Sequence, residues 1–584
     1  MKTFADFHVH PHLKDFNHQD ESSIPNIWKF YKKQIGSLKK LNFLIKDQIK
    51  GLAKHSQINL DYCYAGKVRL VFPSLMAIER QYLVLRPQRP FRTLIRLLLP
   101  THLYTALGAV ATGFPENKIQ KILGNNVDAG ADGGVNYFRP FRKELEYIID
   151  QHNSSSDKYP QATFQIAQTY QDYQLFKKDP DCIVAILTVE GAHNFGDYLK
   201  NSTFFKTYVQ LDTAEKERLD ESMIRNVDFI KKHDYAPFFI TFCHHFNNLL
   251  AGHARSLSAK SLLSEIIPMP GIRHVFNQNP NRDAGISLLG IKIIKKLLQK
   301  EAGKRRILID TKHMSIQSRI EFYELLENHN RDHPDDNIPI IHSHGCISGW
   351  NKLDQAKNKV EYRKIDKTAY FSRWRINLTN EEILKIYDSD GMIGLILHEG
   401  RVPGEAFKKQ AKKIKKCIRK LEKKAIKKIN PDKKKIEEKI RDQLQLKISE
   451  LADLYVQLLL SNIFHILKLI KDRKGANGWK ILSLGSDYDG IVDPFDTFQD
   501  GRTYPSLWAR MDTNLRKAIE GDSNEEKYKI YYANHKNEKE EISPAEIKSL
   551  LFGKSADDVL EDFFLKNIEI FLSKYFTEEY RNQI

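Results

Sequence analysis

The sequence predicts an α/β chain that closes into a (β/α)8 TIM barrel with large helical insertions. Two observations carry this prediction. Eight short apolar runs are spaced along the 584 residues, with helical patterns between several of them. Histidine or acidic residues stand at the carboxyl ends of six of these runs, where barrel enzymes place their catalytic groups. A doubly wound open sheet is the alternative architecture.

Most of the apolar runs are continuous rather than alternating, which is typical of parallel strands buried on both faces. The predicted strands are Thr3–His8, Val68–Leu75, Ile183–Val189, Phe238–Cys243, Arg306–Asp310, Ile338–Ile341, Met392–Leu397 and Lys480–Leu484. Helices are predicted at Ser287–Lys300, Ile316–Asn328 and Asn380–Ser389. We therefore expect residues 1–584 to form a single barrel domain.

Two segments interrupt this alternation and are predicted as insertions. Residues 17–64 are mixed helical and polar. Residues 405–447 predict a basic helical hairpin, because apolar residues recur in steps of four and three from Phe407 to Ile429. The turn Asn430-Pro431-Asp432 follows, and helical spacing then resumes. Lysines coat the outside of both predicted helices.

The net charge is +18, from 92 Lys and Arg against 74 Asp and Glu, and much of it lies in the hairpin. A solvated helix face is the ordinary interpretation, and contact with nucleic acid is the alternative. Aromatic residues, which usually accompany lysines in single-strand binding, are missing there apart from Phe407. We therefore expect no nucleic-acid partner, while docking of a protein partner or a homodimer stays open.

The composition indicates a globular chain without a membrane span, because no run of about 18 apolar residues occurs. The N-terminus lacks the basic, apolar and small-residue pattern of a secretory signal. Five widely spaced cysteines favour free thiols in a reducing compartment. They are Cys63, Cys182, Cys243, Cys346 and Cys417. We expect a cytoplasmic protein.

Polar groups at six strand ends predict a metal centre. The segments are His8-Val9-His10, Glu190 to His193, His244-His245, Asp310 to His313, His342 to His344 and Ser486 to Gly490. Residues two apart on a strand point to the same side, so His8 and His10 can reach one ion. This pair alone could equally be a satisfied pair in the core. Six independent strand ends argue against such a chance pattern.

The ligand types favour two metal ions. Glu190 can bridge two cations because a carboxylate offers two oxygens. His313 and His344, on adjacent strands, can complete the second ion. Neutral imidazoles and carboxylates suit Zn²⁺, or another divalent metal. Asp487 is the candidate proton shuttle beside a water whose pKa two cations lower; a turn-capping carboxylate is the alternative for this residue.

Four segments, in this order, resemble the motifs of the membrane (renal-type) dipeptidase family, peptidase M19, which are metallopeptidases of the amidohydrolase superfamily. They are Thr188 to His193, Ile309 to Ser315, Pro339 to His344 and Leu484 to Gly490. The set is specific, although any one segment alone would not be. Apart from the insertions, the resemblance covers the chain from end to end.

The resemblance implies a role for each residue. His8 and His10 match the positions that bind the first zinc, Glu190 the bridging carboxylate, and His313 and His344 the second zinc. The family usually has Asp where His10 stands, so the choice of metal could differ.

The remaining matched residues act on the substrate. His244 matches a histidine that contacts the scissile group and stabilises its oxyanion, and Asp487 matches the acidic residue after strand eight. Arg375 is the best match for the arginine that binds the substrate carboxylate, with Arg373 as a close competitor. The insertions could reshape the mouth of the barrel and change the substrate.

The resulting hypothesis is a binuclear metal-dependent hydrolase that cleaves the amide bond of dipeptides or similar small N-acyl amino acids. One alternative is another reaction of the superfamily, namely lactone or phosphoester hydrolysis or deamination. The other is a non-catalytic barrel that binds partners through its basic hairpin. Four further histidines could support the ligands or be structural. They are His193, His245, His253 and His342, of which His342 could exchange roles with His344.

Overall fold

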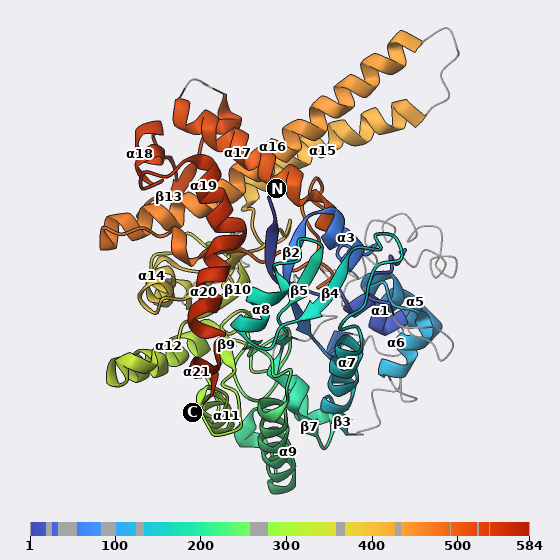
Figure 1. Cartoon of the computed structure of the whole chain (residues 1–584), viewed down its shortest axis with the longest axis vertical. Helices are drawn as coiled ribbons and strands as arrows, with labels where there is room; N and C mark the ends of the chain where they lie inside the picture. The colour runs from blue at the N-terminus through green and yellow to red at the C-terminus, as the bar shows by residue number, and fades with distance from the viewer. Residues whose placement is uncertain are drawn as a thin grey trace, which may run out of the picture.

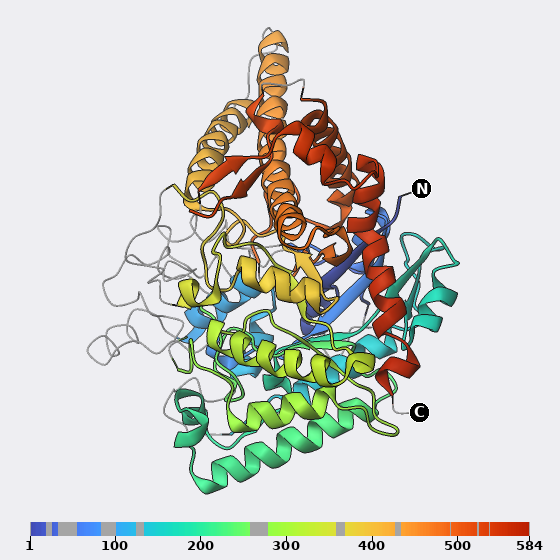
Figure 2. The same ribbon diagram turned by 90° about the vertical axis from the view of Figure 1, so that its left-hand side faces the viewer.

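The computed structural model describes residues 2–18, 26–32, 55–82, 101–123, 134–256, 278, 280–357, 368–426, 434–490, 492–521, 525–536 and 538–582. Within these ranges, eight parallel strands form a closed barrel with helices around it (Figures 1 and 2). In barrel order they are β1 (Phe4–Val9), β2 (Val68–Leu75), β6 (Thr188–Glu190), β8 (Phe239–Thr241), β9 (Leu308–Asp310), β10 (Ile341–Gly345), β11 (Met392–Leu395) and β12 (Leu482–Leu484).

The segment after β12 returns to β1 and closes the barrel. The amide of Asp487 donates to the carbonyl of His8 at 2.9 Å, and the amide of His10 donates to the carbonyl of Tyr488 at 3.0 Å. Closure removes both edges that an open sheet would leave. The predicted barrel is therefore confirmed, and the doubly wound alternative is wrong.

Every strand except β2 differs from its predicted bounds by at least one residue, and two strands differ most. The third predicted strand consists of β5 (Cys182–Ala185) and β6, which pair with successive halves of β2. β5 also pairs with β4 (Thr163–Ile166), an additional strand outside the barrel. The sixth strand, β10, begins at Ile341 rather than Ile338, because the amide of Ile340 donates to the hydroxyl of Ser389 at 3.0 Å instead of to a neighbouring strand.

The three helices predicted between strands are present with nearly the predicted bounds. They are α11 (Leu288–Leu298), α12 (Ile316–Asp332) and α14 (Asn380–Asp388). Each begins after a hydroxyl residue whose side chain accepts a hydrogen bond from a backbone N–H of the first turn. Ser287, Ser315 and Thr379 are these capping residues.

The amino-terminal half of the barrel is filled by aromatic side chains. The ring of Phe7 lies 4.8 Å from that of Phe72 and 5.2 Å from that of Phe239. Phe571 of α20 (Asn567–Tyr575) approaches Phe7 at 6.1 Å, and α20 runs across this end of the barrel (Figure 2). Close packing here leaves the carboxyl ends of the strands for the polar residues.

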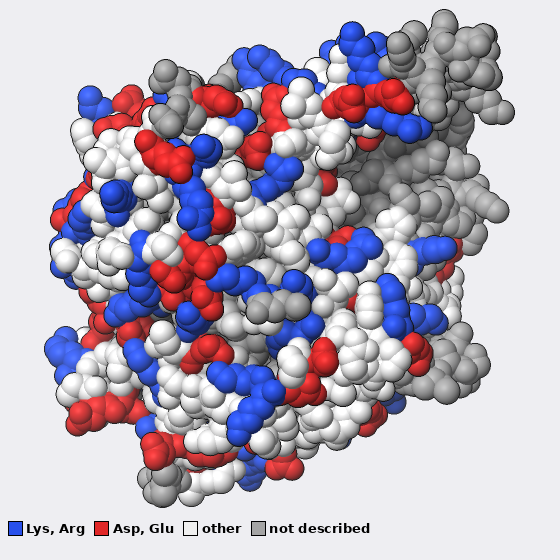
Figure 3. All heavy atoms as spheres, turned by 45° about the horizontal axis from the view of Figure 1, so that its top comes forward, with Lys and Arg blue, Asp and Glu red and all other residues white. Residues whose placement is uncertain are grey.

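The hairpin segment consists of α15 (Glu405–Ile426) and α16 (Lys434–Lys474), which project together away from the barrel (Figure 1). Phe407, Ala411 and Ile414 of α15 are buried near the barrel. α16 continues well past residue 447, because its carboxyl half is apolar and packs in the core. On the face shown in Figure 3, basic and acidic side chains are interspersed.

In the described part of the chain, α16 is also the one helix long and apolar enough to cross a membrane, and 83% of its most apolar stretch is buried inside the protein. All five cysteines are free, as expected. The predicted insertion at 17–64 lies largely outside the described residues. The predicted domain and insertion boundaries stay predictions.

Further elements surround the barrel. The helices are α1 (Leu13–His18), α3 (Leu60–Ala65), α5 (Thr101–Thr112), α6 (Glu116–Leu123), α7 (Phe138–Asp150), α8 (Tyr170–Phe176), α9 (Thr213–Lys232), α13 (Leu353–Lys357), α17 (Tyr504–Glu520), α18 (Pro544–Ser549), α19 (Ala556–Glu561) and α21 (Glu578–Arg581). Two antiparallel ribbons pair β3 (Val135–Asn136) with β7 (Asp197–Tyr198) and β13 (Tyr531–Ala533) with β14 (Lys539–Glu541).

Candidate metal centre

Two groups of ligand atoms meet at Glu190, inside the carboxyl end of the barrel. The first is His8, His10, Glu190 and Asp487, and the second is Glu190, His313 and His344. Within each group the ligand atoms lie within 4.8 Å of one another, and every residue is buried. The structure thus brings the five predicted ligands together, and it adds Asp487 to the first group.

Glu190 faces both groups with its two oxygens. Oε2 lies 3.3 Å from Nε2 of His10, and Oε1 lies 3.7 Å from Nε2 of His8. Oε1 also lies 3.5 Å from Nε2 of His313 and 3.6 Å from Nε2 of His344. A carboxylate placed in this way can contact two cations at once.

The ring nitrogens of the candidate ligands lack hydrogen-bond partners or face one another, an arrangement that suits binding of metal ions. Both ring nitrogens of His8 and both of His10 are buried without a hydrogen-bond partner among the described residues. Nε2 of His313 faces Nε2 of His344 at 3.3 Å, so two imidazoles direct equivalent nitrogens at the same point. Buried polar atoms are normally satisfied. Imidazole nitrogens and carboxylates converging in this way are the donor set of zinc and similar ions.

Backbone geometry aims two of these side chains. His313 has φ = 66° and Asp487 has φ = 61°, in the left-handed region that residues other than glycine rarely adopt. Such strained positions concentrate at functional sites. Gly490 makes room for the second of them, because a Cβ there would lie 2.0 Å from Oδ1 of Asp487.

Two buried aspartates hold the strands that carry the ligands. Asp6 of β1 accepts hydrogen bonds from the amide and hydroxyl of Ser486, and so ties β1 to the segment after β12. Asp310 accepts from the hydroxyl of Ser343 at 2.6 Å, and that hydroxyl lies 2.7 Å from Nδ1 of His344. Chains of this kind orient a ligating imidazole and select its tautomer.

His244 lies beside the two groups, with a partner that the sequence analysis missed. Its Nε2 is 3.6 Å from Oε1 of Glu190, and its Nδ1 is 2.6 Å from Oε2 of buried Glu79. Glu79 also accepts the amide of Phe246 at 3.2 Å. Glu79 follows β2 by four residues. From the sequence, no functional residue was assigned to the end of β2. The first acidic residue after that strand, Glu79, was therefore the one to examine.

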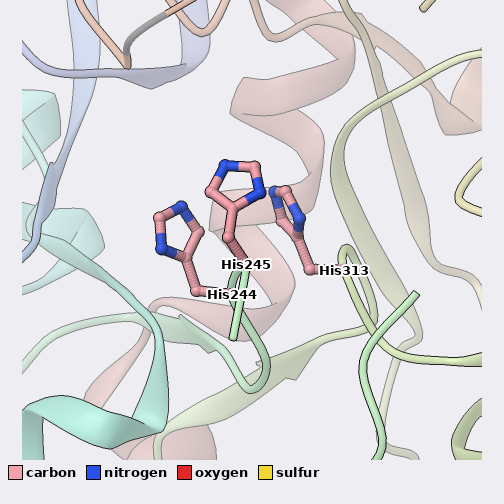
Figure 4. A group of neighbouring side chains, drawn as sticks. All are labelled: His244, His245 and His313. Carbon is pink, nitrogen blue, oxygen red and sulfur yellow. The ribbon is translucent and has the colours of Figure 1, made fainter. Parts of the chain in front are cut away.

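His245 forms a third group with His244 and His313, in which the three imidazoles lie side by side (Figure 4). The ring of His313 is 5.1 Å from that of His244 and 4.7 Å from that of His245. Nδ1 of His245 contacts the hydroxyl of Ser256. The sequence left open whether His245 supports the ligands or is structural. In the structure it lies beside His313, one of the candidate ligands.

Buried charges interact strongly in this site. Burial alone would raise the pKa of Glu190, but the positive charge of His244 and the neighbouring imidazoles of His10 and His313 hold this pKa well below its usual range. Burial alone would lower the pKa of His10, but Asp487 and Glu190 raise it to about 10. Glu190 is therefore an ionised carboxylate that attracts positive charge.

The predicted substrate-binding arginines lie in a segment with aromatic neighbours. The guanidinium of Arg375 is 3.2 Å from Oδ2 of Asp283, and that of Arg373 lies over the ring of Trp350 at 5.0 Å. The role of either residue in binding substrate stays a prediction.

The other three histidines contact backbone or hydroxyl oxygens. Nε2 of His193 is 2.9 Å from the carbonyl of Ala77, and Nε2 of His253 is 3.0 Å from that of Gln278. Nδ1 of His342 is 3.2 Å from the hydroxyl of Thr311.

No protein-family model matches the chain, and the search of curated proteins finds no match. Among solved structures it is similar to a probable dipeptidase, PvdM, from Pseudomonas aeruginosa, at 12% identity over 89% of each chain with a TM-score of 0.42. A metallo peptidase from Rhodobacter sphaeroides, liganded with a phosphinate mimic of the dipeptide L-Ala-D-Ala, gives 10% identity over 98% of this chain and 99% of that chain, with a TM-score of 0.43. An amidohydrolase from Pseudomonas aeruginosa gives 11% identity over 88% and 91%, with a TM-score of 0.36.

Proposed function

We propose that the protein is a binuclear metal-dependent hydrolase that cleaves the amide bond of dipeptides or similar small N-acyl amino acids. One observation carries the metal centre: Glu190 is shared between two buried groups of ligand atoms. The dipeptide class is supported by the resemblance of the four sequence motifs to the renal-type dipeptidases. Zinc fits the donor set, and we propose it as the metal.

In this proposal His8, His10 and Asp487 would hold one ion, His313 and His344 would hold the other, and Glu190 would serve both. Two divalent cations supply Lewis acidity and lower the pKa of water toward neutrality. The protein's own residues bind and orient the substrate, and they transfer a proton from the attacking water to the leaving amine.

His244 and Asp487 are the proposed catalytic residues. Because Glu79 lies 2.6 Å from Nδ1 of His244, we infer that Nδ1 donates to Glu79 and that Nε2 faces the reacting carbonyl oxygen. The carboxylate of Asp487 can accept the proton of the attacking water and pass it to the leaving amine. Arg375 is proposed to bind the substrate carboxylate.

Elemental analysis of the purified protein tests the proposal first. We expect about two equivalents of zinc or a similar metal in the wild type, and most of it lost in Glu190→Ala. The control is Glu144→Gln, which changes a buried carboxylate that pairs instead with His12 at 2.7 Å. A protein that contains no metal and takes up no added zinc would contradict the proposal.

An activity screen of the metal-loaded protein then separates the candidate reactions. A panel of dipeptides and N-acyl amino acids should be hydrolysed, and Glu190→Ala should be inactive on it. Lactones, phosphoesters and aminated bases in the same screen represent the alternative reactions. Turnover of one of these classes, without hydrolysis of any dipeptide, would replace the proposed substrate.

A further inference from the structure

One face of α15, on the hairpin that projects from the barrel, carries eight exposed basic side chains. At 3.6 residues per turn they fall within about 140° of the circumference of the helix and extend over about 22 Å of its length. Glu422 is the one exposed carboxylate over the same length of α15. We call this set the lysine stripe. Its members are Lys409, Lys412, Lys413, Lys416, Arg419, Lys420, Lys423 and Lys424.

The opposite face of α15 is apolar and packs against the rest of the protein. Phe407, Ala411 and Ile414 are buried there, and the ring of Phe407 lies 5.9 Å from that of Tyr455 of α16. Around the helix axis, the apolar residues are centred about 170° from the lysine stripe. The stripe therefore faces away from α16, on a hairpin whose base is fixed to the body of the protein (Figures 1 and 2).

The charges of the lysine stripe are not neutralised within the described part of the chain. None of the eight cations lies within ion-pair distance of a carboxylate there, and the ion pairs of α15 are made by other lysines. Lys408 lies 3.2 Å from Glu405. Lys415 pairs with Glu399 and, at 2.8 Å, with Asp496. Like charges three and four residues apart on a helix repel one another, so an anionic partner would stabilise the stripe.

The composition of the lysine stripe argues against a protein partner or a nucleic acid. Protein interfaces are depleted in lysine and depend on tryptophan, tyrosine and arginine, whereas the stripe consists of seven lysines and one arginine. Single-stranded nucleic acids stack on aromatic side chains, and Phe407 is buried on the other face. Contacts to duplex phosphates usually include serine, threonine, asparagine or tyrosine beside the cations, and residues 405–426 contain none of these.

A negatively charged lipid surface requires none of these additional groups. Clusters of about four to eight lysines or arginines bind acidic phospholipids through charge alone. A membrane surface is flat, so a straight row of cations on a projecting helix can contact it without a matched shape. The apolar face of α15 is already packed, so it has no apolar side chains to insert into the lipid. The contact would therefore depend on charge.

We propose that the lysine stripe binds the surface of a membrane that contains acidic phospholipids and so holds the barrel beside the lipid. The ammonium groups lie against the anionic headgroups, each as a point charge without a fixed partner. Because the contact is electrostatic, it is reversible and becomes weaker as salt shortens the screening length. The inference depends neither on the metal centre nor on the proposed reaction.

Co-sedimentation of the protein with lipid vesicles tests the proposal. Phosphatidylcholine vesicles that contain about one-third phosphatidylserine should bind the wild type, and vesicles of phosphatidylcholine alone should not. Raising the salt concentration from about 0.1 M to about 1 M shortens the screening length from about 10 Å to about 3 Å and should release the protein.

Two quadruple variants with the same loss of charge separate the lysine stripe from the net charge of the protein. The stripe variant carries Lys412→Gln, Lys416→Gln, Lys420→Gln and Lys423→Gln. The control carries the same change at four exposed lysines of the body, namely Lys178→Gln, Lys232→Gln, Lys292→Gln and Lys548→Gln. The stripe variant should bind acidic vesicles at least about 30-fold more weakly than the wild type, and the control within about threefold of it. Both should keep the thermal midpoint, because all eight side chains are exposed and glutamine is nearly as good a helix former as lysine.

Three outcomes would overturn the proposal. The first is a wild type that does not bind acidic vesicles at about 0.1 M salt. The second is a stripe variant that binds as tightly as the wild type, or a control that is weakened as much as the stripe variant. The third is tighter binding, per phosphate, to a duplex oligonucleotide than to acidic vesicles, which would assign the stripe to nucleic acid. Metal content and hydrolysis do not enter these measurements, so failure here leaves the proposed function untouched.

Discussion

Glu79 and His244 form a buried pair in which Oε2 of the glutamate lies 2.6 Å from Nδ1 of the histidine. The two residues are 165 positions apart and follow strands β2 and β8, which lie on either side of β6 in the barrel. Burial alone would lower the pKa of His244, but Glu190 and Glu79 raise it. The pair therefore fixes which nitrogen of His244 faces Glu190.

Replacing Glu79 tests this arrangement. We expect Glu79→Gln to lower kcat about 10- to 100-fold, because an amide holds the imidazole less firmly than a carboxylate. The metal content should not change, since Glu79 belongs to neither ligand group. Steady-state kinetics and elemental analysis on the same sample measure both quantities. Loss of metal together with activity would assign Glu79 to the metal centre instead.

Asp487 and Asp489 are expected to respond differently to the same substitution. Asp487→Asn should lower kcat by about 10²- to 10⁴-fold, because it removes both the proposed proton acceptor and a proposed metal ligand. Asp489 pairs with Lys14 at 2.6 Å and accepts the amides of Gln57 and Ile58. Asp489→Asn should therefore lower the thermal midpoint while the surviving protein keeps its kcat. Equal loss of activity in both variants would mean that the loop, and not the carboxylate of Asp487, is required.

His465 of α16 makes the stability of the protein depend on pH away from the metal centre. Its Nδ1 accepts the amide of Ala533 at 3.1 Å, and its Nε2 lies 2.7 Å from Oδ1 of Asn380. Burial lowers its pKa to about 3, whereas an unfolded histidine titrates near 6.5. Below pH 6.5 the unfolded chain binds the proton and the folded protein does not, so stability is lost as the pH falls from 6.5 toward 3.

Urea unfolding of wild type and His465→Gln between pH 7 and pH 4 measures this contribution. Wild type should lose up to about 1.4 kcal/mol per pH unit more than the variant below pH 6.5. The difference in unfolding free energy between the two proteins should therefore shrink as the pH falls. Parallel curves over the whole range would show that His465 does not titrate in this window.

The projecting part of the hairpin should be dispensable for folding and metal binding. The described residues between 416 and 446 are exposed or half-buried, whereas Lys415 pairs with Asp496 at 2.8 Å and belongs to the body of the protein. Replacing residues 416–446 by a short Gly-Ser linker should leave the thermal midpoint and the metal content unchanged. A variant that fails to fold would show that the hairpin belongs to the core. If the wild type is a dimer in solution and the variant is a monomer, the hairpin joins two copies of the chain.

The barrel could be predicted from the sequence because each strand is a short apolar run between helical patterns. The bounds of β2 were predicted to the residue, since Val68–Leu75 is rich in apolar residues and almost entirely buried. The division of the third strand into β5 and β6 was not predictable, because it depends on which half of β2 each part pairs with. The length of α16 was underestimated, because its apolar half belongs to the core rather than to the hairpin.

The sequence by itself determined the fold class and the five candidate ligands, because their residue types and their positions at strand ends are local properties of the chain. Only the tertiary structure decided how they meet: that Asp487 joins His8 and His10, and that Glu79 holds His244. These relationships connect residues up to 479 positions apart (His8 and Asp487). Distances across a closed barrel depend on strand order and side-chain packing, which no local pattern encodes.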